Sequence, residues 1–111
     1  MGSTIAEKIL ARHAGRATVR AGEVVVADVD FAMVTDTRAA NTIKMIGRMG
    51  DKELKFARNT ALVLDHYSPP PNLEAAEIHT AMRAFAAERG TRLYDIGDGI
   101  CHQVVPEGGH L

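Results

Sequence analysis

The sequence predicts an α/β fold, a small and mostly parallel sheet with flanking helices. Short apolar runs that suit buried strands alternate along the chain with longer segments in which apolar residues recur at helical spacing. Strands that alternate with helices favour parallel pairing through right-handed crossovers. The chain has 111 residues, of which 46% are hydrophobic and 24% charged, as is typical of one globular domain with one core. We therefore expect residues 1–111 to form a single α/β unit.

A first helix is predicted near residues 3–14. Ser3 and Thr4 are candidate N-caps, and Gly15 can end the helix. Apolar side chains recur between them at helical spacing, at Ile5, Ile9 and Leu10. The pattern indicates an amphipathic helix.

A strand is predicted over residues 23–28. The run VVVADVDFAMV is dominated by valine, which favours strands, and is interrupted by Asp28 and Asp30. We place both aspartates near the carboxyl end of this strand. A helix of about ten residues is predicted to follow within 38–50, where Gly50 closes a segment with apolar residues at helical spacing.

The second half of the chain continues the alternation. The apolar run ALVLD, residues 61–65, is typical of a strand that is covered on both faces. A helix is predicted from its N-cap, Asn72, to Gly90. Residues 91–97 are predicted to be a third strand. The glycine-flanked segment 98–110 is a candidate for one more short strand.

Charge and composition exclude several classes of function. The 13 basic and 14 acidic residues are spread evenly and give a net charge of −1, so no basic field attracts nucleic acid or an anionic membrane. No apolar segment approaches the roughly 20 residues that span a bilayer, and the N-terminus does not follow the pattern of a signal peptide. We expect a cytoplasmic protein that binds neither nucleic acid nor membranes.

Polar side chains follow the predicted strands at their carboxyl ends. Asp65 and His66 come directly after the second strand, and His102 follows the third. Asp28 and Asp30 finish the first strand in the same way. Ligands of open α/β sheets bind beyond these ends, and a histidine held by a carboxylate can pass a proton to or from a leaving hydroxyl group. The same pair also suits a turn with a structural hydrogen bond, so the residues alone leave catalysis and structure equally open.

The other histidines and the cysteine suggest less. His79 lies inside a predicted helix and His13 near a helix end, where a solvated side chain or an interaction with the helix dipole is expected. The pattern assigns no role to His110. The single cysteine, Cys101, cannot form an internal disulfide or a multi-cysteine metal site. It is a buried thiol, a reactive thiol or part of a site completed elsewhere.

Five segments of the chain carry a resemblance to a known family. In order they are MGSTIAEKILARHAG, VVVADVDFAMVTD, LVLDHYSPPP, AAEIHTAMRAFAAERG and LYDIGDGICHQVVPEGGH. They resemble the N-terminal part of the large subunit of 3-isopropylmalate dehydratase and its relatives, homoaconitase and dimethylmalate dehydratase, in the aconitase superfamily. The resemblance implies a hydro-lyase that acts on a hydroxy di- or tricarboxylate in amino-acid biosynthesis, which is leucine biosynthesis for the isopropylmalate enzymes.

The resemblance also implies roles for individual residues. The DH and HQ motifs of the family carry active-site histidines. His66, oriented by Asp65, would therefore protonate the departing hydroxyl group or orient its water, and His102 would hold substrate or water through a hydrogen bond. The positions implied in substrate binding are Asp28, Asp30 and Gln103, and for the two aspartates a role in supporting the residues that contact the substrate is an equal alternative.

The cofactor and partners implied by the resemblance lie largely outside this chain. The family uses a four-iron, four-sulfur cluster whose cysteine ligands come later in its sequence, and Cys101 is not one of them. We therefore expect the cluster in the complete enzyme, none bound to this chain alone, and no metal ligand among its residues. The implied partners are the rest of the large subunit and a small subunit that carries the substrate-recognition loop.

These expectations describe an inactive N-terminal fragment that self-associates through apolar surface. Two alternatives stay open. A stand-alone α/β module for protein interaction or regulation could reuse the fold. A mononuclear metal hydrolase could use Asp65, His66, His102 and Asp30, although no compact ligand spacing supports it.

Overall fold

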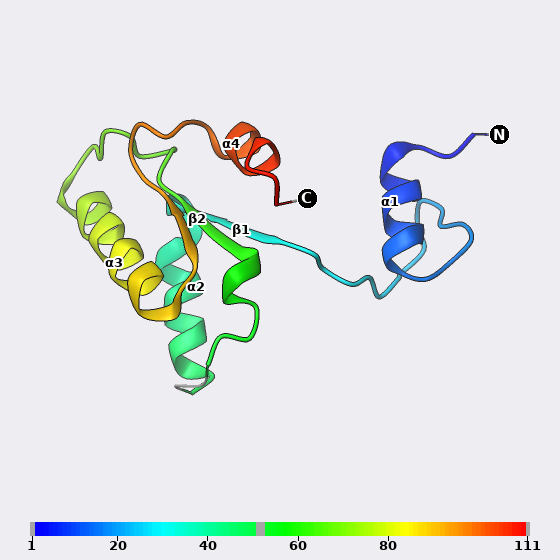
Figure 1. Ribbon diagram of the computed structural model, residues 1–111, viewed down its shortest axis with the longest axis horizontal. Coiled ribbons are helices and arrows are strands. Elements are labelled where there is room, and N and C mark those ends of the chain that lie inside the picture. Colours follow the sequence, from blue (N-terminus) through cyan, green and yellow to red (C-terminus); the bar gives the residue numbers. More distant parts are fainter. Residues whose placement is uncertain (1, 51–52, 111) are drawn as a thin grey trace. The chain divides into compact units, whose positions relative to one another are not determined.

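The structure, a computed structural model, describes residues 2–50 and 53–110. The chain divides into two compact units, one up to Asp30 and one from Phe31 onward. The sequence predicted one α/β unit over the whole chain, whereas the sheet belongs to the second unit. Figure 1 shows the elements of both units.

The first unit contains one helix, α1, Ile5–His13. Thr4 caps it in a reciprocal arrangement: its hydroxyl oxygen accepts the N–H of Glu7 at 3.2 Å, and the Glu7 carboxylate accepts the N–H of Thr4 at 2.8 Å. These bonds satisfy two donors at the start of the helix. The helix predicted near 3–14 is confirmed, with Thr4 as its cap.

The strand predicted at 23–28 is wrong. Residues 23–28 form no strand, and the side chains of Val24 and Val26 are 97% and 92% exposed. Valine favours an extended chain, but a strand also needs a neighbour for its N–H and C=O groups, and no described segment pairs with this one. The first strand begins instead at Ala32.

The second unit is built on a three-stranded parallel sheet (Figure 1). Its strands are β1, Ala32–Thr35, β2, Thr60–Val63, and β3, Arg92–Tyr94, in the order β1-β2-β3. A 3-10 turn, η1, Ala57–Asn59, leads into β2. In the register, Val34 lies beside Leu62, and Leu62 beside Leu93. The predicted α/β class with a parallel sheet is confirmed.

The helices α2, Asp36–Arg48, and α3, Leu73–Arg89, connect these strands. The Asn72 side chain accepts the N–H of Ala75 at 2.9 Å, as expected of an N-cap. Gly90 ends α3 with φ at 72°, a left-handed conformation that glycine adopts without a steric penalty. The predictions of both helices are confirmed, although α2 starts at Asp36 rather than Arg38.

Strand β2 is the centre of the core and is buried on both faces. Leu62 and Leu64, on one face, pack with residues of α2 and α3. Ala61 and Val63, on the other face, pack with α4, Cys101–Glu107. Because alternate side chains of a strand point to opposite faces, a strand covered on both sides has to be apolar throughout, which explains the run ALVL.

The segment considered as a fourth strand forms the helix α4 instead. Cys101 and Val105 are four residues apart, so a helix places both on one side, where they are buried against the sheet. Pro106 lacks an N–H and therefore cannot donate to the carbonyl of His102, one turn earlier. The strand prediction is wrong, because the buried residues of this segment recur at the four-residue spacing of a helix and not at every second residue as in a strand.

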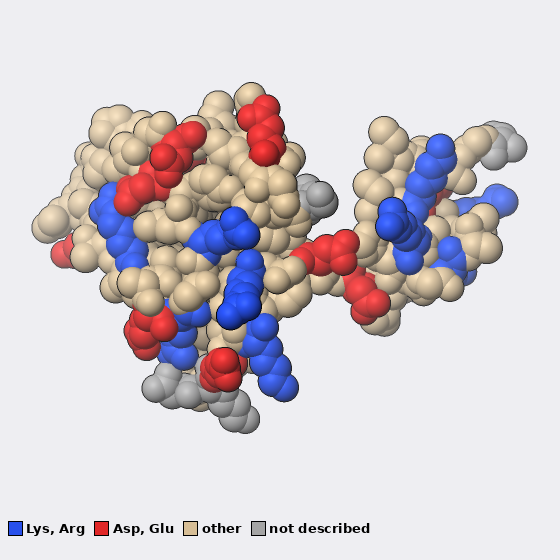
Figure 2. Space-filling view, viewed as in Figure 1, with Lys and Arg blue, Asp and Glu red and all other residues tan. Residues whose placement is uncertain are grey.

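The surface carries charges of both signs. Figure 2 shows basic and acidic side chains interspersed on the visible face, in line with the net charge of −1. Among the described residues, no helix has the length and apolar character needed to cross a membrane.

Candidate active site

Each of the three strands leads into an aspartate. Asp36 directly follows β1, Asp95 directly follows β3, and Asp65 lies two residues beyond β2. The N–H of Leu64 donates to the carbonyl of Tyr94 at 2.9 Å, so the chain still pairs with β3 as it approaches Asp65. Because the strands are parallel, the three carboxylates lie at the carboxyl edge of the sheet, where ligands of open α/β sheets bind.

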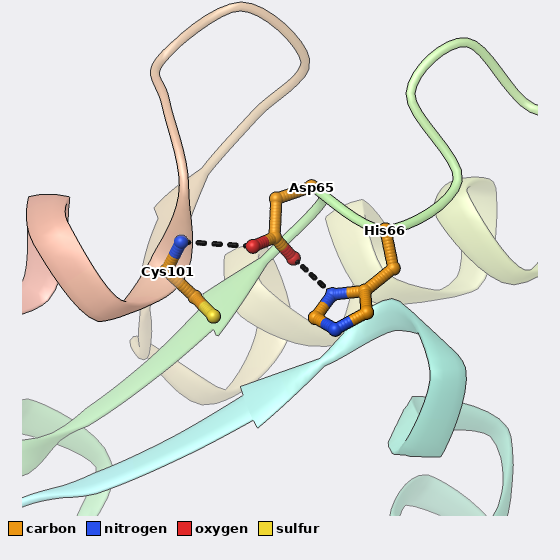
Figure 3. Close-up of side chains that lie close together, drawn as sticks. All are labelled: Asp65, His66 and Cys101. Atoms are coloured by element: carbon orange, nitrogen blue, oxygen red, sulfur yellow. Dashed lines mark hydrogen bonds and ion pairs between the residues drawn. The ribbon is translucent and has the colours of Figure 1, made fainter.

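Asp65, His66 and Cys101 meet at this edge (Figure 3). Oδ1 of Asp65 lies 2.7 Å from Nδ1 of His66, and Oδ2 accepts the backbone N–H of Cys101 at 2.8 Å. The carboxylate therefore bridges the end of β2 and the start of α4. Both of its oxygens are engaged, so its orientation is fixed.

Two opposing effects act on the pKa of Asp65. Burial works to raise the pKa, but the hydrogen bonds from the Cys101 N–H and the His66 ring outweigh it. The pKa of Asp65 is lowered as a result. At neutral pH the side chain is a carboxylate, the form that can orient a histidine and stabilise its positive charge.

The ring of His66 is partly open to solvent. Its Nδ1 faces Asp65 and also lies 3.8 Å from Oδ1 of Asp36. A carboxylate can only accept, so the geometry assigns a hydrogen to Nδ1. The side chain is 46% exposed, and Nε2 has no hydrogen-bond partner in the described part of the chain. This nitrogen is available for proton exchange with a ligand.

Cys101 is a buried thiol. Burial raises its pKa, and the hydrogen bond to the Asp65 carboxylate and the charge of that carboxylate raise it further. The neutral thiol is therefore favoured. Nucleophilic attack and metal ligation both require the thiolate, so this environment opposes them.

Asp65, His66 and Cys101 also have the chemistry of metal ligands. Each offers one ligand atom, and these atoms lie within 4.8 Å of one another. A metal ion here would have to break the bond between His66 and Asp65 and deprotonate a thiol whose pKa is raised. The arrangement favours a hydrogen-bonded carboxylate–histidine pair over a metal site.

His102 and Gln103 lie in the first turn of α4 and are exposed. The bond from the Cys101 N–H to Asp65 holds this turn at the carboxyl edge of the sheet. The Gln103 side chain donates to Oε1 of Glu107 at 3.1 Å, along the helix. The structure thus brings the HQ motif to the same edge as Asp65, and contact of either residue with substrate stays a prediction.

Asp28 and Asp30 are not where the sequence placed them. They belong to the first unit and precede β1 instead of following a strand. The N–H of Asp28 donates to the carbonyl of His13 at 2.9 Å, and Oδ2 of Asp30 lies 3.4 Å from Nε2 of His13. The prediction that they end a strand is wrong, because the strand itself starts later in the chain.

The sequence patterns did not point to Asp36 or His79, which lie next to this site. Both side chains are buried, and Nε2 of His79 lies 3.1 Å from Oδ2 of Asp36. The expectation of a solvated or dipole-bound His79 is wrong, because α3 turns this ring inward. A usable signal for Asp36 was the run AMVTD, an apolar segment that ends in an aspartate as ALVLD does.

His110, to which the sequence assigned no role, packs in the second unit. Its ring stacks on Phe31 with centroids 4.8 Å apart, and its Nε2 shares a hydrogen bond with the Tyr94 hydroxyl. These contacts indicate a structural role.

Three relatives with known names match nearly the whole chain. The 3-isopropylmalate dehydratase large subunit of Methanoregula boonei is 47% identical over 109 residues, 98% of this chain and 26% of that protein. The probable 3-isopropylmalate dehydratase large subunit of Methanothermobacter thermautotrophicus is 40% identical over 112 residues, 100% of this chain and 27% of that protein. The homoaconitase large subunit of Thermus thermophilus is 40% identical over 109 residues, 98% of this chain and 26% of that protein. The chain is similar to an N-terminal segment of these large subunits.

This similarity confirms the resemblance that the five sequence segments indicated. The chain spans about a quarter of the length of the curated relatives that it matches. No protein-family model matches the chain.

Proposed function

We propose that the chain is a segment of the large subunit of an aconitase-type hydro-lyase, in which Asp65 and His66 handle the proton of the reacting hydroxyl group. The 2.7 Å contact between these residues, at the carboxyl edge of the sheet, carries the proposal. The names of the relatives support the class of reaction, because a dehydratase removes water from its substrate. The proposed substrate is a hydroxy di- or tricarboxylate related to isopropylmalate or homoaconitate.

The chemistry of His66 follows from its two nitrogens. Hydroxide is a poor leaving group, so the hydroxyl oxygen must gain a proton as its bond to carbon breaks. The charged ring donates the Nε2 proton to that oxygen, the bonding electron pair moves to oxygen, and water leaves. In the hydration direction the neutral ring takes the proton back from water.

Asp65 supports both directions of this transfer. It holds the hydrogen on Nδ1, which fixes the tautomer that leaves Nε2 free to accept, and its charge stabilises the ring while the ring is positive. The lowered pKa keeps Asp65 ionised while His66 exchanges its proton. We assign the second half of the elimination, removal of hydrogen from the adjacent carbon, to no residue of this chain.

His102 and Gln103 are proposed to contact the substrate. The support for this role is their position in the first turn of α4, which Asp65 holds at the same edge of the sheet. Substrate binding by Asp28 and Asp30 stays a prediction of the resemblance.

The residues of this chain do not fit a four-iron, four-sulfur cluster. Such a cluster is held by several thiolates, whereas the chain has one cysteine, buried and with a raised pKa. We propose that in the complete subunit the cluster ligands lie outside these residues, and that the chain alone is inactive. Iron and sulfide analysis after anaerobic reconstitution of the isolated chain tests this, and a stoichiometric cluster in the monomer would contradict it.

The proposed partners are the remainder of the large subunit and a small subunit. The relatives are named large subunits, which supports a smaller companion. A cytoplasmic location stays a prediction.

A chimaeric enzyme tests the proposed function. Residues 1–111 replace the matching segment of the Methanoregula boonei large subunit, to which they are 47% identical, and the chimaera is combined with the small subunit of that organism. We expect isopropylmalate dehydratase activity, followed by the ultraviolet absorbance of the unsaturated product. His66→Asn should lower kcat by about 100-fold to 10,000-fold, the usual contribution of a general acid.

Glu77→Gln is the control. Glu77 is exposed on α3 and is not among the residues proposed to contact substrate. Its replacement should leave kcat within about twofold, the scale of a surface substitution. An active chimaera in which His66→Asn behaves like Glu77→Gln would exclude the proposed role.

A further inference from the structure

A buried carboxylate, that of Asp36, accepts hydrogen bonds from the backbone of the candidate active site. Asp36 is fully buried at the junction of β1 and α2. Its Oδ1 accepts the N–H of His66 at 3.3 Å, and its Oδ2 accepts the N–H of Tyr67 at 2.9 Å. Two consecutive N–H groups of an exposed loop are thus bound to one internal group.

His79 completes the environment of Asp36. Its Nε2 lies 3.1 Å from Oδ2 of Asp36, and its ring is 1% exposed. A carboxylate offers only acceptors, so Nε2 carries the hydrogen. Nδ1 of His79 is buried with no partner among the described residues, and a hydrogen there would be a further buried donor without an acceptor. The geometry therefore places a hydrogen on Nε2, which donates to Asp36.

Three donors from distant segments converge on this one side chain. His66 and Tyr67 lie 30 and 31 residues from Asp36, and His79 lies 43 residues away. The charge of a buried carboxylate makes such bonds stronger than those between neutral groups. The bonds from His66 and Tyr67 tie the loop after β2 to the start of α2, and the bond from His79 ties α3 to the same residue.

We propose that Asp36, held in place by His79, is a positioning residue that fixes the backbone of His66 and Tyr67 and thereby aims the His66 ring. This inference rests on the proposed role of His66 as the proton donor. His66 directly follows Asp65 in sequence. The bond between these two neighbouring side chains therefore does not by itself fix the backbone of the loop that follows β2. Figure 3 shows His66 beside the point where β1 passes into α2, which is where Asp36 begins the helix.

The 111-residue chain allows a direct test by hydrogen exchange. In the unaltered chain, the amides of His66 and Tyr67 should exchange at least about tenfold more slowly than in the unfolded chain, although their loop is on the surface. In Asp36→Asn the single remaining acceptor oxygen cannot serve all three donors, so at least one of the two amides should lose its protection. Nitrogen NMR of the His66 ring should show less of the tautomer with hydrogen on Nδ1.

A pair of His79 variants keeps the test independent of simple unfolding. His79→Gln retains a side-chain N–H that can donate to Asp36, and it should keep most of the protection. The His79→Leu side chain has no donor, so this variant should lose the protection of the His66 and Tyr67 amides. Met82→Ala removes a fully buried side chain of the same helix, so it should lower stability without selectively exposing the two amides or changing the His66 tautomer.

The outcome separates this inference from the proposed function. Two results would overturn the positioning role of Asp36 independently of enzyme activity. One is that the His66 and Tyr67 amides are unprotected in the unaltered chain. The other is that these amides exchange at equal rates in His79→Gln, His79→Leu and Met82→Ala. In the active chimaera, Asp36→Asn should lower kcat by about tenfold or more with little change in KM, as expected when alignment of a catalytic group is lost. An unchanged kcat there would also overturn the positioning role, whereas indifference to His66→Asn would overturn the proposed function.

Discussion

The carboxylate of Asp65 accepts the backbone N–H of Cys101 at 2.8 Å, across 36 residues of sequence. Helix α4 begins at Cys101, and Ile100, at its N-cap position, makes no side-chain hydrogen bond to it. Asp65 therefore supplies from the end of β2 the acceptor that a local cap would normally provide. The same carboxylate binds His66, so docking of α4 and orientation of the candidate catalytic ring depend on one side chain.

Asp65→Asn should destabilise the second unit. An amide has one acceptor oxygen, which cannot serve both the Cys101 N–H and the His66 ring, and its NH₂ group adds donors where acceptors are needed. Loss of a charge-assisted bond at a buried group lowers the free energy of unfolding by about 1–3 kcal/mol. Urea denaturation followed by circular dichroism measures the change.

Glu77→Gln is the control for that measurement. Glu77 is exposed on α3, and the substitution makes the same change from carboxylate to amide. We expect a change within about 0.5 kcal/mol, as for most surface substitutions. Equal effects of the two variants would contradict the bridging role of Asp65.

The ion pair of Asp95 with Arg83 should make stability depend on pH in acid. Both carboxylate oxygens accept from the guanidinium at 2.7 Å, and this hydrogen bonding lowers the pKa of Asp95 from 3.8 to about 2. Because the folded-state pKa is depressed, the stabilisation is complete above about pH 3.8 and is lost as the pH falls toward 2. Asp65, whose pKa is also lowered, acts in the same direction.

Asp95→Asn should flatten the stability profile between about pH 4 and pH 2. Both partners are substantially exposed, so the difference should stay below about 1 kcal/mol and shrink in high salt. Unfolding free energies at a series of pH values, for the unaltered chain and the variant, provide the measurement. A profile that keeps its slope in Asp95→Asn would show that other carboxyl groups govern acid unfolding.

The sequence predicted the parts of the fold that local patterns control. The cap at Asn72 and the stop at Gly90 are local signals, and both lie where α3 begins and ends. The run ALVL indicated a strand buried on both faces, and β2 is that strand. Pairing is not a local property, so the valines at 23–28 looked like a strand although no described segment pairs with them.

The candidate site divides in the same way. Asp65 and His66 are adjacent in sequence, and their position after an apolar run was enough to place them at the edge of the sheet. The contact of Asp36 with His79 joins two helices across 43 residues, and nothing in the local pattern of either helix signals it. An inward-facing histidine can be distinguished from a solvated one only when the packing of α3 is known.

Cys101 should react slowly with thiol reagents. Burial and the neighbouring Asp65 carboxylate raise the pKa of its thiol, and the thiolate is the reactive form. At pH 8 we expect alkylation by iodoacetamide at least about tenfold slower in the folded chain than in urea. Mass spectrometry over time measures the rate, and equal rates in the two states would contradict the buried, protonated thiol.

Self-association is expected from the apolar surface of the first unit. Ile5 and Ile9 on α1 are 78% and 53% exposed, and Val24 and Val26 are 97% and 92% exposed on a segment that pairs with no strand in the described part of the chain. Burial of such side chains contributes roughly 25 cal/mol per Å², and an unpaired extended segment can add hydrogen bonds with another chain. The chain should therefore form dimers or larger assemblies in sedimentation equilibrium.

A charged double variant shows whether the valine segment is responsible. Val24→Lys with Val26→Lys places two positive charges on that segment, which should shift the equilibrium toward monomer because pairing would bring like charges together. Thr80→Lys, at an exposed position of α3, adds charge elsewhere and should leave the association unchanged. A monomer at high micromolar concentration in the unaltered chain would contradict the prediction. Equal weakening by the valine and Thr80 substitutions would instead indicate that net charge, rather than the segment at 24–26, controls assembly.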